Sequence, residues 1–295
     1  PSMMSGNANQ QTCTVHDQSW PKDYWKGGHV WGVGERGWVF GSSEIVSSDA
    51  DQLILADKIP FWSNGPGTLV LCGVLSALDT EREWHQQEGR VYLWTPNGSD
   101  PNGLDVEATR RRWAFDVRKR SHIHIEGFDI FAASINFNEA EHCTVENCRL
   151  RYPSFDGSLR GGFNRDRGVS AESEGMGIVL GGSDNAVRKT VVAYCVGDGI
   201  SVFGSNNRVE DCVVHDCNLS GSDCAPITCS GSGHAILHST LFNAGRSVLV
   251  HRRLKQGRIG IGDGLQRRVM ARNAVIGEQL QFLFVAPGGK VFKGT

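Results

Sequence analysis

The chain has 295 residues, which is enough for one large domain or two. Its 30 basic and 32 acidic residues nearly balance, so it lacks the general electrostatic footprint of a protein that binds nucleic acid or an anionic membrane. No apolar run approaches the ~18 residues that indicate a membrane-spanning helix, so no membrane partner is expected.

Residues 1–28 are polar and contain Pro21 and Gly27-Gly28, which predicts an irregular lead-in. They show neither the basic nor the apolar region of a signal peptide. Residues 29–103 show short, irregularly spaced β-strands and end in a cluster of turn residues. We interpret this segment as a small antiparallel, sandwich-like β unit with its tryptophans mainly in the core. Exposed tryptophans there could instead stack on sugar rings.

Residues 104–265 repeat a short β-rich unit. Two apolar columns run through the copies, five residues apart. The first is Ile125, Val145, Val187, Val209, Ile236 and Ile259, and the second is Ile130, Leu150, Val192, Val214 and Leu241. Between them lies a column of mostly small or hydrogen-bonding residues, which suits an inward corner: Phe128, Cys148, Thr190, Cys212 and Ser239. A further strand precedes several copies, at 177–183, 199–205, 226–232 and 247–251.

Such units, punctuated by Gly, Asn and Ser, predict a solenoid in which each turn buries its apolar row against the next. The pattern resembles the right-handed parallel β-helix of the pectate-lyase-like superfamily over about half of the chain. The predicted fold class is therefore all-β, a right-handed parallel β-helix preceded by a small antiparallel β unit. The resemblance implies a secreted or periplasmic protein.

Two segments fall outside the repeat. Residues 153–174 form a charged insertion that includes Arg165 and Arg167. Loops that leave a rigid scaffold often bind ligands, so both arginines are candidate substrate-binding residues, and a solvated excursion is the alternative. Residues 266–295 contain a short basic helical pattern at 266–276. They are expected to cap the last turn or to pack on another chain, so a homo-oligomer could form through the β-helix ends.

The nine cysteines are an odd number, so at least one is unpaired or pairs between chains. We expect mainly buried free thiols, with a Cys195–Cys217 bridge as the alternative. No cysteine or histidine spacing typical of zinc is present, and no metal or other cofactor is expected.

Asp198 and Asp223 lie one turn plus a few residues apart. If both project from the same face, their carboxyls are separated by roughly 5 to 10 Å. This range includes the separations found in retaining and inverting glycosidases. We therefore predict Asp198 and Asp223 as the acid and the base or nucleophile of a glycoside hydrolase. For each, the alternative is a turn residue that bonds its own backbone.

The segments Gly197-Asp198-Gly199, Ser222-Asp223-Cys224, Gly233-His234-Ala235 and Arg258-Ile259-Gly260 loosely resemble the motifs of polygalacturonases. The Asn-Thr-Asp and Asp-Asp signatures and the lysine of that family are absent. The complete set of predicted site residues is Asp198, Asp223 and His251 as catalytic groups, with Arg252, His234, Asp216, Arg165 and Arg167 binding substrate.

Equivalent residues of successive turns form a row that suits a linear polymer, so the expected partner is a polysaccharide or oligosaccharide. Three functions stay open. The first is hydrolysis of glycosidic bonds. The second is a lyase on a uronate-containing glycan, with His251 and neighbouring arginines as base and neutralising groups or with bound Ca²⁺. The third is a non-catalytic β-helix that binds glycans or assembles at its ends.

Overall fold

A computed structural model describes residues 4–9, 11–33, 40–59, 66–106, 109, 111–153, 176–219, 224–244, 249–251, 260–261, 282–285 and 291–294. The described residues form two compact units, one up to Val106 and one from Thr109 onward. Among them, no helix has the length and hydropathy of a membrane span.

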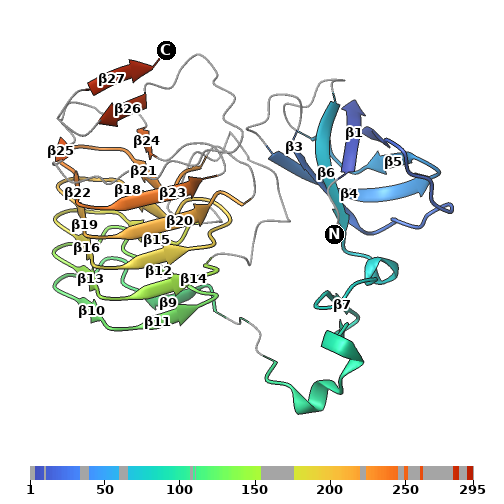
Figure 1. Ribbon diagram of the computed structural model, residues 1–295, viewed down its shortest axis with the longest axis horizontal. Coiled ribbons are helices and arrows are strands. Elements are labelled where there is room, and N and C mark those ends of the chain that lie inside the picture. The colour runs from blue at the N-terminus through green and yellow to red at the C-terminus, as the bar shows by residue number, and fades with distance from the viewer. Residues whose placement is uncertain are drawn as a thin grey trace. The chain divides into compact units, whose positions relative to one another are not determined.

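The first unit contains a closed antiparallel barrel (Figure 1). Its strands are β1 (Met4–Asn9), β2 (Thr12–Val15), β3 (His29–Val33), β4 (Phe40–Asp49), β5 (Gln52–Leu55) and β6 (Pro66–Cys72), in the order β1-β2-β5-β4-β3-β6. The buried side chains of Trp25, Ile45, Leu53 and Leu69 belong to its core. The irregular lead-in predicted for residues 1–28 is wrong where β1 and β2 form. The sandwich-like arrangement is also wrong, because β1 pairs with β6 and closes the sheet.

A separate hairpin follows the barrel. It consists of β7 (Trp84–Gln87) and β8 (Arg90–Leu93), with short 3₁₀ helices at Leu75–Ala77, Pro96–Gly98 and Pro101–Gly103. Glu88 and Gly89 both have positive φ, 51° and 76°, as the tight type I′ turn of a two-residue hairpin requires. Trp84 is 68% exposed and Trp94 is 43% exposed, so the core location expected for the tryptophans is wrong for these two.

The second unit is a stack of β-coils whose strands form three parallel sheets (Figure 1). Each of the first five coils contributes one strand to each sheet, and β24 and β25 of the last coil extend two of them. The first sheet contains β10 (His124–Glu126), β13 (Thr144–Glu146), β16 (Ala186–Arg188), β19 (Arg208–Glu210), β22 (Ala235–Leu237) and β25 (Gly260–Ile261). The second contains β11 (Asp129–Phe131), β14 (Arg149–Arg151), β17 (Val191–Ala193), β20 (Val213–Cys217) and β23 (Thr240–Ala244). The third contains β9 (Trp113–Asp116), β12 (Ser134–Asn136), β15 (Ile178–Leu180), β18 (Ile200–Val202), β21 (Ile227–Cys229) and β24 (Leu249–His251).

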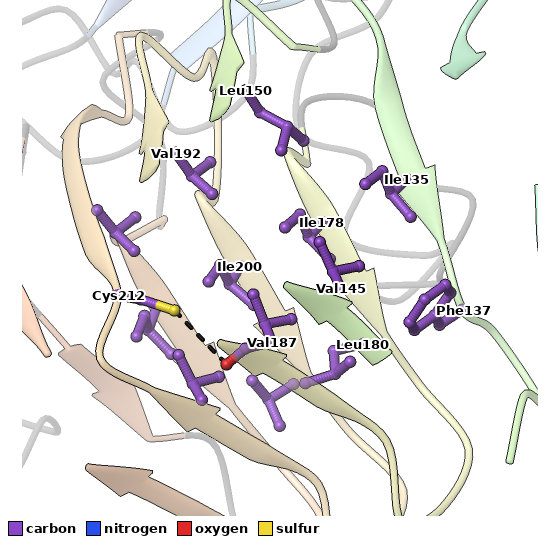
Figure 2. Close-up of a cluster of buried hydrophobic side chains, with 14 of the residues drawn as sticks. Ile135, Phe137, Val145, Leu150, Ile178, Leu180, Val187, Val192, Ile200 and Cys212 are labelled. Atoms are coloured by element: carbon purple, nitrogen blue, oxygen red, sulfur yellow. Dashed lines mark hydrogen bonds between the residues drawn. The ribbon is translucent and has the colours of Figure 1, made fainter. Parts of the chain in front are cut away.

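The strand register confirms the predicted columns. In the first sheet, Val145, Val187, Val209 and Ile236 are aligned on successive coils. In the second sheet, the predicted column from Ile130 to Leu241 is aligned throughout. These side chains pack into one core with Ile135, Ile178 and Ile200 of the third sheet (Figure 2). The prediction is wrong in the last coil, where Ile261 and not Ile259 pairs with Ile236.

The predicted small column forms a hydrogen-bonded corner. The Cys148 amide donates to Thr190 Oγ1 at 3.3 Å, and the Cys212 amide donates to Ser239 Oγ at 3.1 Å. The Cys212 thiol donates in turn to the Val187 carbonyl oxygen at 3.5 Å (Figure 2). Burial raises the pKa of Cys212 to about 11, so this group is a thiol at neutral pH and retains its donor proton. Phe128 departs from the column, because it is 48% exposed on the first coil.

All nine cysteines are free thiols in the structure, including Cys195 and Cys217. Burial raises the pKa of the Cys195 thiol well above its usual value.

Near the end of the chain, β26 (Phe282–Val285) pairs with β27 (Val291–Gly294) in an antiparallel hairpin. The basic helix predicted at 266–276 lies outside the described residues, and the capping or assembly role of 266–295 stays a prediction.

Candidate functional site

The second sheet carries a continuous row of rings on its outer side. The row, called the ring row below, consists of Phe131, Tyr152, Tyr194, His215 and Phe242, one ring from each of five successive coils. Neighbouring ring centroids lie 5.6, 4.7, 5.9 and 4.7 Å apart in that order. This is the largest set of ring contacts among the described residues.

The strand register explains why these rings meet. Leu150, Val192 and Val214 point into the core, so the residues just after them point outward or form the corner. Tyr152 and Tyr194 occupy this corner with φ of 54° and 60°, and the equivalent residues of the other coils also have positive φ. A shared left-handed corner brings side chains of successive coils to about 4.8 Å from one another.

The orientation of the rings determines which atoms a ligand can reach. Tyr152 and Tyr194 are nearly parallel, at 14°, and so are His215 and Phe242, at 4°. Both centroid distances match the spacing between coils, so these rings lie across the axis of the β-helix. Each ring of a stacked pair covers one face of its partner, so the ring edges, with the tyrosine hydroxyls, are the parts best placed to face a ligand.

A polar cluster lies beside His215 and Phe242, the rings of the last two coils. His215 Nδ1 is 2.5 Å from Asp216 Oδ2, and Asn243 donates its side-chain amide to the other oxygen of Asp216. The His215 and Asp216 side chains are 19% and 20% exposed, so both reach solvent. Asp216, which the sequence predicted as substrate-binding, is thus fixed beside the ring row in the structure.

A basic group lies beside Phe131 and Tyr152, the rings of the first two coils. The Arg151 guanidinium is 5.8 Å from the centre of the Phe131 ring. Its Nη2 contacts the Asp129 carboxylate at 3.3 Å, and the two side chains are 40% and 55% exposed. The ring row therefore has an ion pair, Arg151 with Asp129, near its first two coils and the Asp216 carboxylate near its last two.

The outer side of the third sheet is different because it is buried. Val179, Ser201 and Thr228 are at most 6% exposed although they alternate with core residues along their strands. Asp198 lies there and is 3% exposed. Its carboxylate accepts hydrogen bonds from Ser201 Oγ at 2.6 Å, the Ala225 amide at 2.9 Å and Thr228 Oγ1 at 2.5 Å.

Such an environment fits a structural carboxylate better than the catalytic acid or base predicted for Asp198, because its oxygens are occupied and shielded from a polymer. Replacing Asp198 with asparagine removes one acceptor, and we expect the free energy of unfolding to fall by about 1–2 kcal/mol. Any glycan binding or turnover per folded molecule should not change. Denaturant titration together with an activity assay checks this. A large loss of turnover at unchanged stability would restore the catalytic role.

His234 also has a structural environment. It is 1% exposed, its Nδ1 accepts the Asn207 amide at 3.1 Å, and its Nε2 donates to the Ser230 carbonyl at 2.9 Å. Asn185 makes the same pair of bonds two coils earlier in the stack. Its Oδ1 accepts the Cys143 amide, and its Nδ2 donates to Gly181, four residues before it. His234 thus takes the place of an asparagine in an internal ladder and does not fit the predicted contact with substrate.

The remaining predicted residues are only partly described. His251 ends β24, where it pairs with Cys229, and its side chain lies outside the described residues. Asp223, Arg252, Arg165 and Arg167 lie entirely outside them. The pairing of Asp198 with Asp223 therefore stays a prediction. In the part of the chain that the structure describes, no group of three or more His, Cys, Asp or Glu side chains could hold a metal ion.

A family model described as "Right handed beta helix region" matches residues 116–255. This part of the chain folds as a right-handed parallel β-helix, called the β-helix region below. The match agrees with the three parallel sheets and with the resemblance seen in the repeat. The matched residues include every ring of the ring row.

No curated protein matches the chain. Similar solved structures include the tailspike protein gp49 from Pseudomonas phage LKA1, at 12% identity and a TM-score of 0.23, covering 88% of this chain and 45% of that one. Another is the Gp54 tailspike of Acinetobacter baumannii bacteriophage AP22 in complex with A. baumannii capsular saccharide, at 7% identity and a TM-score of 0.24, covering 88% and 43%. The chain thus spans less than half the length of either tailspike. Similarity at these TM-scores says nothing about what this chain binds.

Sequence reasoning missed the ring row of the β-helix region. The signal is present, because each ring follows a residue of the second apolar column by one or two positions. The offset is two positions for Tyr152 and Tyr194 and one for the other three rings. A search for residues at one fixed spacing overlooks a row that alternates between the last strand position and the corner.

Proposed function

We propose that the β-helix region binds a polysaccharide along the ring row. The observation that supports this most is that five rings from successive coils form one contiguous row with polar groups at its outer edge. A chain of sugars has the same character, since it is linear and offers hydroxyl groups at regular intervals. Tyr hydroxyls can both donate to and accept from such groups, and the Asn243 amide and the Arg151 guanidinium add further donors.

Hydrolysis of the bound glycan is the catalytic form of this proposal. It rests on Asp223 and His251, because the three hydrogen bonds of the buried Asp198 argue against that residue as a partner. The buried Asp198 favours a second candidate, a glycan-binding β-helix without catalysis. No cofactor is needed for either, and a lyase could neutralise the uronate with Ca²⁺ or with arginine.

Replacing both Tyr152 and Tyr194 with phenylalanine tests the binding surface. The rings and their stacking remain, and only the two hydroxyls are lost. We expect affinity for the bound polysaccharide to fall about ten-fold, as two hydrogen bonds of about 1 kcal/mol or less each would give. Affinity electrophoresis in gels that contain neutral or uronate polysaccharides measures this effect.

Tyr92→Phe, on the separate hairpin, is the matched control and should leave affinity unchanged. Unchanged affinity in the double variant, for a polysaccharide that the wild type binds, would rule out the ring row. Release of reducing ends from the same polysaccharides separates hydrolysis from binding alone.

A further inference from the structure

The outer side of the second sheet has an uneven distribution of charge. Its first two coils carry Asp129, Arg149 and Arg151, with a net positive charge. Its next three coils carry the apolar or neutral side chains of Val191, Ala193, Val213, Thr240 and Phe242 on strands β17, β20 and β23. The carboxylate at this end is that of Asp216, which lies 2.5 Å from His215 Nδ1 and accepts the Asn243 side-chain amide.

Arg151 is only partly engaged. Its contact with Asp129 uses one nitrogen, Nη2, at 3.3 Å to each carboxylate oxygen, which is longer than a strong charge-assisted hydrogen bond. Arg151 Nε is buried and has no hydrogen-bond partner among the described residues, so a ligand cannot reach this atom. The donors that a ligand can reach are those of the terminal nitrogens, and the side chain is 40% exposed. A planar guanidinium with free donors is well suited to bind a carboxylate or sulfate.

The separation between Arg151 and the His215–Asp216 pair along the β-helix axis is set by the strand register. Arg151 pairs with Ala193, and Ala193 pairs with His215, so Arg151 and His215 occupy one column two coils apart. Two steps of parallel strand spacing amount to about 10 Å. This is close to the length of a disaccharide in an extended glycan.

We infer that the ring row selects a glycan in which acidic and neutral sugars alternate. The acidic sugar lies at Arg151, and a neutral sugar lies at His215 and Asp216. An acidic sugar at the second position would face the carboxylate of Asp216, and like charges at short range repel each other. A polymer with an acid on every sugar should therefore bind less well than an alternating one. This inference rests on the proposed function and specifies its ligand.

Calorimetric titration with three soluble polysaccharides tests the inference: one neutral, one with a uronate on every sugar, and one with alternating uronate and neutral sugars. The wild type should bind the alternating polymer most tightly. Arg151→Gln should weaken binding of the alternating polymer about ten-fold, since a hydrogen bond to a charged group contributes about this much. It should weaken binding of the neutral polymer much less, because glutamine keeps an amide donor. Asp216→Asn should strengthen binding of the all-uronate polymer several-fold.

Arg188→Gln is the matched control. Arg188 lies on the first sheet, its side chain is 41% exposed, and it pairs with a carboxylate, Glu210, at 3.5 Å. The Arg188→Gln variant should bind all three polymers as the wild type does. Equal weakening by Arg188→Gln and Arg151→Gln, or equal weakening of the neutral and alternating polymers by Arg151→Gln, would overturn the inference. If the wild type binds none of the polymers, the proposed function itself fails.

Discussion

Gly204→Ala should lower the free energy of unfolding of the β-helix by about 3 kcal/mol or more, as expected for a buried backbone clash combined with an unfavourable φ. Gly204 has φ of +90°, and a Cβ there would lie 2.0 Å from the carbonyl oxygen of Gly182 on the preceding coil. That oxygen accepts the Ser205 amide at 3.0 Å, and the Gly204 oxygen accepts the Ser232 amide at 3.1 Å. The coils cannot move apart to make room without breaking these bonds.

Gly127→Ala separates the clash from the cost of φ. Gly127 has φ of +77°, and a Cβ there would have no atom within 4 Å. This variant should cost only about 1 kcal/mol, the usual cost of a left-handed non-glycine residue. Urea titration followed by far-ultraviolet circular dichroism measures both, with the transition of the barrel treated separately because the chain has two units. An equal loss in the two variants would show that the close approach of the coils is not what requires glycine at 204.

The core of the β-helix could be predicted from sequence because each coil repeats the same burial. Val187 and Val209 are one coil of 22 residues apart, and Val145 and Val187 are 42 residues apart because that coil includes the charged insertion. Their alignment follows from the repeat once the insertion is recognised. The last coil was misplaced because Ile259 and Ile261 both fit an apolar column. The barrel was missed at its start because Met4–Asn9 has only one large apolar side chain, Met4, and Gly6 and Ala8 give a weak alternation with the polar residues. Its closure depends on pairing between β1 and β6, which the local pattern does not contain.

The candidate site was harder to predict, for a different physical reason. Asp198 and Asp216 look alike in sequence, since each is a turn aspartate near a strand. Their difference is burial. Asp198 lies on the covered outer side of the third sheet, and Asp216 lies at a solvent-accessible corner beside the second sheet. A repeat pattern shows which residues point inward. It does not show which outer side is covered, and that decides which carboxylate a polymer can reach.

The other large effect is expected from the internal ladder. Asn185→Leu keeps the approximate size of the side chain but removes its polar atoms. The Cys143 amide then loses its acceptor at 2.8 Å, and the Gly181 carbonyl loses its donor at 2.8 Å. The Ala140 carbonyl also loses the Asn185 amide but keeps the Ser183 amide at 3.0 Å. Because Asn185 is fully buried, water cannot replace these partners, and the free energy of unfolding should fall by about 3 kcal/mol.

His234→Asn is the control that distinguishes the ladder from burial in general. The imidazole of His234 bonds the Asn207 amide with one nitrogen and the carbonyl four residues earlier with the other. An asparagine makes the same two bonds at Asn207, where Nδ2 donates to the Phe203 carbonyl at 2.8 Å. Asparagine at 234 should therefore cost less than about 1 kcal/mol, mainly for the smaller volume. A loss as large as that of Asn185→Leu, in the same urea titration, would mean that the ring is needed for its shape and not for its hydrogen bonds.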